Sequence, residues 1–464
     1  MGWNNMVFSS ITFLYYFLPF LLICYYIVPK KYRNITLLVF SLMFYFYGEK
    51  NIILVLSCIL NYFIGTMLNN KHKKWYLTIG IIFNVLLLAY YKYSNFFIEN
   101  VNNLFNLDLK YLSLILPLGI SFFTFQNISY LVDVYKGEVP AQKNIFQYAT
   151  YITLFPQLIA GPIVRYKDIN EELENRKENF SDFSAGIVRF IIGLSKKVLI
   201  ANTIGSMCTT LNGLAEKTVL SHILEAIGYT FQLYFDFSGY SDMAIGLGLL
   251  FGFHFKENFN YPLIASSITD FWRRWHISLS SFFRDYIYIP LGGNRTTTFK
   301  WIRNICVVWL LTGLWHGASW NFVLWGLYFL VFLVIEKLFL KKFLKNGIFS
   351  HLYTLVIVIF SFVIFNMPDL ASIGYFFKSI LGFNSLSFAN MQSLYYLKNY
   401  LVILVVAGIC STPLLKILSE KLQNKKFFKT LINVASPICY IGLALLCSAN
   451  LLSNSFNPFI YFRF

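Results

Sequence analysis

Long stretches without charged side chains recur along the 464 residues of this chain, and they restrict the folds it can adopt. Examples are residues 8–28, 75–91, 352–367 and 401–415. A helix needs roughly 20 apolar residues to cross about 30 Å of hydrocarbon, and fewer where the bilayer is thin. Because a chain in lipid must satisfy its own backbone polar groups, these runs are expected to be helices. The sequence therefore predicts an all-α, polytopic membrane protein with roughly eleven transmembrane helices.

The composition agrees with a membrane protein. The chain is 57% hydrophobic and only 13% charged, whereas soluble domains carry about 25% charged residues. Its formal net charge is +17, but the basic residues gather in short loops between apolar runs, as cytoplasmic loops do. We therefore interpret the charge as a signal of orientation and expect no nucleic-acid partner.

The basic loops predict how the chain is oriented in the cell (plasma or inner) membrane. Four loops are rich in lysine and arginine, at residues 30–33, 71–74, 337–345 and 416–429. If all four are cytoplasmic, both termini lie outside. Lys196 and Lys197 do not fit this rule, because they lie within an apolar stretch. We expect one multi-pass integral-membrane domain, 1–464, without a soluble module or an internal repeat.

Neither cysteine nor histidine spacing indicates a metal site. The seven cysteines lie mostly within apolar runs, and neither a C-x-x-C pair nor an H-E-x-x-H motif occurs. We expect no metal and no bound cofactor.

One apolar run carries a histidine. In "NICVVWLLTGLWHGASWNFVLWGLYFL" (304–330), His316 is the only histidine, and the run contains no Asp, Glu, Lys or Arg. Residues 305–315 make only about 16 Å of helix, Gly317 then breaks it, and the chain returns to a basic loop at Lys337. This pattern predicts a re-entrant hairpin with His316 at its tip. An ionisable group at that depth indicates function.

The alternative is a neutral histidine that serves only packing. Gly313 and Gly317 favour the functional interpretation, since they permit the close backbone approach that a ligand tunnel needs.

A second polar segment is unusually aromatic. "DFWRRWHISLSSFFRDYIYIPLGGNR" (270–295) is typical of an amphipathic helix followed by a Pro-Gly-Gly turn, lying on or dipping into the membrane. His276 lies within it.

These motifs resemble the membrane-bound O-acyltransferase superfamily, and within it the bacterial alginate O-acetyltransferase branch. The resemblance covers nearly the whole chain. It is carried by the 270–295 block and by "PLGISFFTFQNISYLVDVYKGEVPAQ" (117–142), "FPQLIAGPIVRY" (155–166), "FDFSGYSDMAIGLGLLFGF" (235–253), "ENFNYPL" (257–263), "LTGLWHGASWNFVLWG" (311–326) and "FNPFIYFRF" (456–464).

Two positions depart from the family pattern. The late "FFR" element of the family reads "IFN" here, at 364–366, so no arginine role is carried over. Lys256 stands where a proline is expected. Neither departure touches the histidines.

The resemblance implies a ring of tilted helices around a thinned centre. A tunnel would join a cytoplasmic donor site to an outward acceptor site. The invariant histidine of the family corresponds to His316, and the second, more variable polar position corresponds to His276.

Acyl transfer from a thioester to a hydroxyl needs a base, support for the oxyanion and exclusion of water. A neutral histidine suits the base near neutral pH, so we assign that role to His316. No G-x-S-x-G elbow occurs, which favours direct attack by the acceptor over a covalent relay, although a relay stays open. His276 could orient the acyl carbonyl or set the tautomer of His316; alternatively, it is an interfacial histidine.

Three arginines, Arg273, Arg274 and Arg284, could bind the phosphates of a donor, or could simply anchor the segment at the membrane surface. We expect Asp270 and Asp285 to be their partners. The further candidates for donor binding or for the tunnel are Trp272, Trp275, Asn258 and Trp315. The polar residues within 236–242 are expected to serve structural hydrogen bonding.

Together these features predict a membrane O-acyltransferase. It would move an acyl group, most simply acetyl, from acetyl-CoA or another acyl thioester for O-acetylation of an exported or cell-wall polysaccharide. An exported SGNH-type esterase or transferase is expected as its partner, because the outer loops are too short for a catalytic domain. The alternatives are D-alanyl transfer to teichoic acid from a carrier protein and, in another class, a transporter or lipid scramblase.

Overall fold

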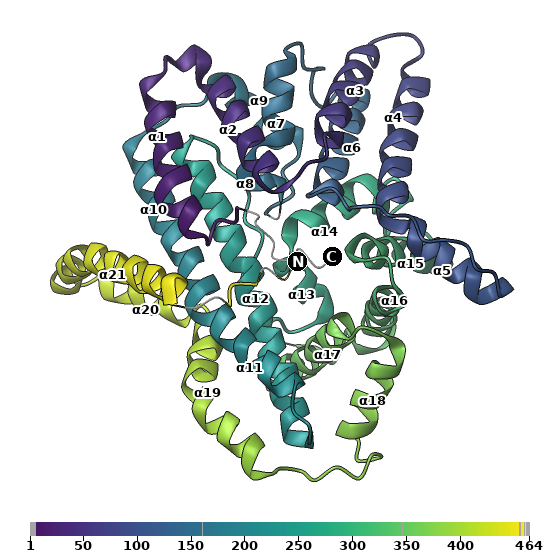
Figure 1. Cartoon of the computed structure of the whole chain (residues 1–464), viewed down its shortest axis with the longest axis vertical. Helices are drawn as coiled ribbons and strands as arrows, with labels where there is room; N and C mark the ends of the chain where they lie inside the picture. The colour runs from purple at the N-terminus through teal and green to yellow at the C-terminus, as the bar shows by residue number, and fades with distance from the viewer. Residues whose placement is uncertain (1–5, 160, 346, 454–455, 459, 461–464) are drawn as a thin grey trace. The chain divides into compact units, whose positions relative to one another are not determined.

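The chain folds into helices. The computed structural model describes residues 6–159, 161–345, 347–453, 456–458 and 460, and within them helices are the only regular elements (Figure 1). The prediction of an all-α chain is thus confirmed for the described residues. The helices form two compact units, which we describe separately: residues 1–190 with 243–256, and residues 191–242 with 257–464.

The first unit holds the N-terminal helices. They are α1 (Leu18–Ile27), α2 (Arg33–Gly48), α3 (Ile53–Met67), α4 (Lys73–Leu88), α5 (Ser94–Phe105), α6 (Ile120–Lys136), α7 (Ile145–Thr153), α8 (Phe155–Leu158) and α9 (Tyr166–Asn175), followed by most of α10 (Phe180–Ser195).

Aromatic rings and buried amides hold this unit together. The ring of Phe8 lies 5.0 Å from that of Phe13 and 5.7 Å from that of Phe44. Asn61 on α3 and Asn84 on α4, both fully buried, exchange side-chain hydrogen bonds of 3.3 and 2.6 Å. Such amide pairs join helices that lipid alone would not drive together.

The second unit holds the remaining helices. They are the end of α10, α11 (Asn202–Asn212), most of α12 (Val219–Leu250), α13 (Ile268–Arg274), α14 (Ile277–Phe283), α15 (Thr298–His316), α16 (Trp320–Ile335), α17 (Ile348–Asn366), α18 (Leu370–Ile380), α19 (Met391–Cys410), α20 (Leu414–Gln423) and α21 (Lys426–Ser453).

Several helices are long and apolar enough to cross a membrane. Within the described residues they are five, at 73–105, 320–340, 348–366, 391–410 and 426–453, and shorter apolar helices cover 13–27 and 53–67. All four apolar runs that the sequence singles out overlap these helices. The predicted total of roughly eleven crossings stays a prediction.

The two lysines that break the positive-inside pattern lie in a helical turn at 196–201 and are paired with acids of α12. Lys196 contacts Asp242 and Lys197 contacts Asp236, each at 2.6 Å. Lys197 also donates a hydrogen bond to the carbonyl of Pro458. These residues therefore neutralise buried charge rather than mark a cytoplasmic loop, which agrees with the structural role expected for the polar residues of 236–242.

Of the C-terminal motif 456–464, residues 459 and 461–464 lie outside the described part of the chain. The amide of Ile460 donates to Asp236 at 3.0 Å.

Candidate active site

His316 ends a helix at the turn of a helical hairpin. Helix α15 finishes at His316, residues 317–319 make the turn, and α16 packs back against α15 (Figure 1). The structure therefore contains the predicted hairpin, with its turn where the sequence placed it. However, α15 begins at Thr298 rather than near 305, which makes it about 28 Å long instead of about 16 Å.

Glycines let the two helices of this hairpin touch. A Cβ on Gly313 would lie 2.4 Å from the carbonyl oxygen of Phe322, and one on Gly326 would lie 2.4 Å from that of Trp309. A Cβ on Gly317 would strike the ring of Phe322. The close backbone approach that these glycines permit is therefore present at Gly313, where the backbone of the partner helix makes it.

A backbone carbonyl and aromatic rings fix His316. Its Nδ1 lies 2.7 Å from the carbonyl oxygen of Thr312, one helical turn earlier. Because a carbonyl only accepts, Nδ1 carries a proton, so Nε2 is the nitrogen that carries the lone pair when the ring is neutral. The rings of Trp325 on α16 and Phe365 on α17 lie 4.9 and 5.4 Å from the imidazole. The imidazole is therefore oriented and buried, as a general base requires.

His276 occupies the junction between α13 and α14. Its backbone adopts φ +46° and ψ +53°, a left-handed conformation that costs a non-glycine residue of order 1–3 kcal/mol. Each of the two flanking helices is only seven residues long, about 10 Å, so this segment does not span a membrane. The structure thus keeps a strained turn that places one imidazole.

Asn258 sets the tautomer of His276. The amide nitrogen of Asn258 donates to Ser241 Oγ at 2.9 Å, so its Oδ1 faces the imidazole and accepts from His276 Nδ1 at 3.2 Å. The same Oδ1 accepts from the amide and the hydroxyl of Ser278, at 3.2 and 2.8 Å. Nε2 of His276 consequently holds the lone pair.

That Nε2 is buried and has no hydrogen-bond partner among the described residues. Burial lowers the pKa of His276 well below its usual value, and the nearby His316 lowers it further. Trp315 contacts both imidazoles: its ring centroid is 6.0 Å from that of His276 and 4.9 Å from that of His316. The two histidines predicted from the sequence therefore meet around one tryptophan.

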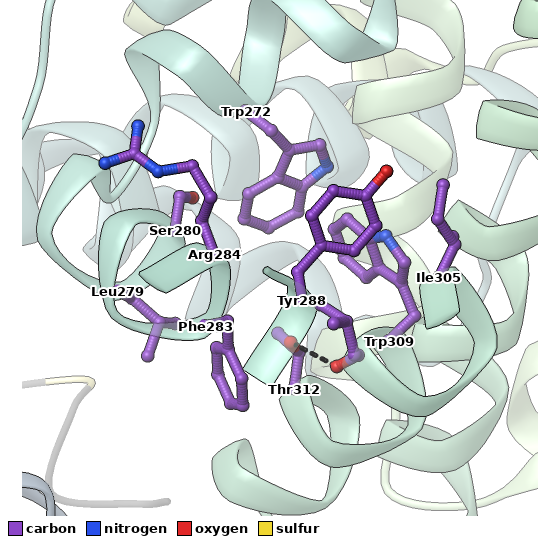
Figure 2. A pocket seen from close by; sticks show the side chains of 10 residues that line it. Trp272, Leu279, Ser280, Phe283, Arg284, Tyr288, Ile305, Trp309 and Thr312 are labelled. Atoms are coloured by element: carbon purple, nitrogen blue, oxygen red, sulfur yellow. Dashed lines mark hydrogen bonds between the residues drawn. The ribbon is translucent and has the colours of Figure 1, made fainter. Parts of the chain in front are cut away.

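A narrow pocket of about 180 Å³ lies between α14 and α15 (Figure 2). Trp272, Tyr288 and Trp309 gather around it, and Arg284 stands at its edge. Thr312, whose carbonyl holds His316, also lines it. The pocket is thus mostly apolar and reaches the helical turn that carries His316.

The arginines have different surroundings. Arg284 lines the pocket and pairs with Asp285 at 2.7 Å, whereas Arg274 is paired with Asp270 at 3.0 Å and lies outside the pocket lining. Arg273 is exposed and has no ion pair within the described residues. Both acids therefore partner arginines, as expected, and only Arg284 is positioned at the pocket.

The remaining candidate residues pack against other aromatic rings or orient a histidine. Trp272 packs against Trp309 at 4.7 Å, and the ring of Trp275 stacks on Phe271 at 5.5 Å. Asn258, a candidate for donor binding or for the tunnel, orients His276. The sequence reasoning missed Ser278 and Thr312, because a hydroxyl or a carbonyl within a helix carries no distinguishing pattern.

Comparison with known proteins agrees with the motifs. The model of MBOAT, the membrane-bound O-acyltransferase family, matches residues 138–377. The chain is 36% identical over 500 residues to the probable alginate O-acetylase AlgI of Azotobacter vinelandii, covering 99% of this chain and 100% of that protein.

Other relatives have related names. The peptidoglycan O-acetyltransferase of Helicobacter pylori is 36% identical, with 83% of this chain and 82% of that protein covered. The teichoic acid D-alanyltransferase of Bacillus subtilis is 32% identical, with 55% of this chain and 69% of that protein covered. The resemblance on which the sequence interpretation rests is confirmed: this chain is a membrane acyltransferase and belongs to the membrane-bound O-acyltransferase family.

Proposed function

We propose that this chain transfers an acetyl group from a cytoplasmic thioester for O-acetylation of a polysaccharide outside the cell membrane. The observation that carries the proposal is the pair of buried imidazoles around Trp315, each with Nδ1 held by an acceptor. Relatives named for alginate and for peptidoglycan O-acetylation support a polysaccharide acceptor.

His316 acts as the general base in this proposal. Its Nε2 takes the proton of the acceptor hydroxyl while that oxygen attacks the thioester carbonyl. The C–S bond then breaks, and the imidazolium returns the proton to the leaving thiolate. The products are one ester and one thiol, so the transfer needs no redox partner.

His276 has a more restricted role than its residue type suggests. Because Asn258 holds the proton on Nδ1, the neutral ring offers only an acceptor at Nε2. It can therefore take a proton or accept a hydrogen bond from a hydroxyl, but it cannot donate from Nε2 to an acyl carbonyl until it is protonated. The tautomer of His316 is set by Thr312 and does not depend on His276.

The donor is acetyl-CoA or another acyl thioester in this proposal. The pocket beside α15 holds about 180 Å³, which suits the narrow thioester end of such a donor and not its nucleotide. Arg284 at its edge can bind a donor phosphate. Arg273 and Arg274 then serve to anchor the segment at the membrane surface.

The proposal also includes the membrane in which the chain lies and a partner protein. We place the chain in the plasma or inner membrane, with the basic loops in the cytoplasm. We also propose an exported SGNH-type esterase or transferase that passes the acetyl group to the polymer. Because the family consists of enzymes, the transporter and scramblase alternatives are set aside.

D-alanyl transfer to teichoic acid is the second candidate. It is favoured by the relative of that name, which however aligns with only 55% of this chain. Mass spectrometry of the acyl group released by mild base separates the two, since one yields acetate and the other D-alanine.

The proposal is tested in a deletion strain complemented with either the wild-type chain or His316→Ala. We expect the wild type to restore O-acetyl groups on the surface polysaccharide and the variant to restore none. Full restoration by His316→Ala would refute its role as the base.

A further inference from the structure

A pocket in the first unit has a wall rich in cationic side chains. It holds about 660 Å³, within the range of small-molecule sites. It lies where the turn between α1 and α2 meets the start of α7 and the end of α9. Among its lining residues are five cations and two acids: Lys30, Lys31, Arg33, Arg176, Lys177, Glu174 and Glu178. These side chains together carry a formal charge of +3.

The positive-inside rule places this pocket at the cytoplasmic surface of the membrane. Helix α1 ends at Ile27 and α2 begins at Arg33, and both helices are apolar. The basic turn between them therefore lies where the chain leaves and re-enters the hydrocarbon. The opposite wall, at the end of α9, belongs to the polar stretch "EELENRKEN" (171–179), which must stay out of the hydrocarbon.

The two arginines of the pocket share one carboxylate. Arg33 lies 2.8 Å and Arg176 lies 3.8 Å from Glu178. Aromatic rings fix both guanidiniums: that of Arg33 is 5.1 Å from the ring centroid of Tyr25, and that of Arg176 is 4.7 Å from that of Phe253. Nε of Arg33 is buried without a hydrogen-bond partner among the described residues. Because one carboxylate cannot neutralise two guanidiniums, the pair keeps a net positive charge.

The three lysines of the pocket are available to a ligand. Lys30, Lys31 and Lys177 are all exposed. None of the three forms an ion pair within the part of the chain that the structure describes. Flexible ammonium groups bind phosphate as mobile point charges, and fixed guanidiniums bind it through directed donors. The pocket therefore matches a ligand that carries a phosphate group.

Exposed apolar side chains lie beside this pocket on the two helices. Ile23 and Ile27 are exposed on α1, and Ile35 and Val39 are exposed on α2; in each pair the residues are one helical turn apart and share a face. Ile35 also lines the pocket, as does the half-exposed Tyr32, a residue type common at the level of lipid headgroups. A soluble phosphate compound gains nothing from this surface, whereas the acyl chains of a lipid can lie against it.

We propose that this pocket binds the headgroup of an anionic phospholipid of the cytoplasmic leaflet. Lys30, Lys31 and Lys177 surround its phosphate, and its acyl chains run beside Ile27 and Ile35. Basic pockets at this level of a membrane protein are general recognition sites for such headgroups. The inference does not rest on the proposed function, because all of these residues belong to the first unit and none is assigned to acyl transfer.

The test counts bound lipid by native mass spectrometry. The full chain, purified in a neutral detergent, is titrated with phosphatidylglycerol, and the apparent Kd of the first bound lipid is measured. Lys30→Gln and Lys31→Gln together should raise that Kd about 30-fold, a change of about 2 kcal/mol at about 1 kcal/mol for each lysine. Since both side chains are exposed, the double variant should keep the thermal stability of the wild type in detergent.

Lys71→Gln combined with Lys74→Gln is the matched control. Both lysines are exposed in another basic loop of the same unit, and neither lines the pocket. This variant removes the same charge and should bind phosphatidylglycerol as the wild type does. Zwitterionic phosphatidylcholine should bind the wild type more weakly than phosphatidylglycerol, and neither double variant should change its Kd.

Unchanged phosphatidylglycerol binding after loss of Lys30 and Lys31 would overturn the proposal. Equal weakening in the two double variants would also overturn it, because binding would then follow the overall surface charge and not this pocket. Glycerol phosphate and coenzyme A distinguish a lipid from a soluble phosphate compound. If either displaces the lipid at a concentration near the lipid's own Kd, the pocket takes a soluble ligand and the lipid assignment fails.

Discussion

Replacing Asn258 with leucine tests how the site is held together. Asn258 is fully buried, and its side chain accepts three hydrogen bonds, two from Ser278 and one from His276, and donates one to Ser241. If each of these hydrogen bonds contributes about 1 kcal/mol, the substitution should lower the free energy of unfolding by roughly 3–4 kcal/mol. It also frees the imidazole to change tautomer and orientation, and misplacement of about 1 Å can cost 10²-fold in rate. We therefore expect turnover to fall about 10²-fold.

A matched control separates stability from orientation. Asn304 is equally buried in the same unit and donates to the carbonyl of Gly293, but its side chain has no bond to a histidine. Asn304→Leu should destabilise the chain comparably and leave turnover per folded molecule near that of the wild type. The assay is acetyl transfer per folded molecule, measured well below the unfolding temperature of both variants. Equal turnover losses in the two variants would refute the positioning role of Asn258.

Three further predictions concern stability. Burial alone would lower the pKa of His254, but the hydrogen bond and charge of Glu172 and the charge of Asp182 raise this pKa above 6.5. The protonated imidazole therefore stabilises the fold below about pH 6.5, and this stabilisation is lost as the pH rises through the folded-state pKa. Thermal unfolding between pH 5.5 and 8.5 should show this decline in the wild type and not in His254→Gln. Gly326→Ala should lower the free energy of unfolding by about 1–3 kcal/mol through overpacking. Gly408→Ala, with nothing near its Cβ, should not lower it. Equal effects of the two substitutions in denaturant titrations would contradict the close contact between the hairpin helices. Lys197→Met leaves the buried carboxylate of Asp236 without its cation and should cost about 3–5 kcal/mol. An unfolding midpoint like that of the wild type would show that the ion pair is not formed.

The sequence predicts features that depend on local pattern. His316 stands out because a histidine in a run without charged side chains is costly there, and the structure places it at the turn where the pattern breaks. The pairing of Arg284 with Asp285 follows in the same way, since the two residues are adjacent.

Features that depend on distant partners could not be predicted. A glycine at position 313 permits a close approach, but the sequence does not say which backbone makes it, and in the fold it is the carbonyl of Phe322 on the next helix. Lys197 meets its acid 39 residues later, at Asp236, on another helix. Asn258 reaches His276 because the chain between them folds back, which no spacing rule contains.

The central claim is that His316 removes the acceptor proton and does not bind the donor. Purified wild-type chain, His316→Ala and the control His351→Ala should be compared in nanodiscs for acetyl transfer and for acetyl-CoA affinity by calorimetry. His351 also lies on an apolar helix of the same unit, but its imidazole contacts the carbonyl of Ala265.

We expect His316→Ala to lower transfer by about 10²–10⁴-fold, the usual effect of removing a positioned base, while its acetyl-CoA affinity stays within about twofold of the wild type. His351→Ala should match the wild type in both measurements. If His316→Ala instead keeps its turnover, or loses transfer only because acetyl-CoA no longer binds, then His316 is not the base and the account is contradicted.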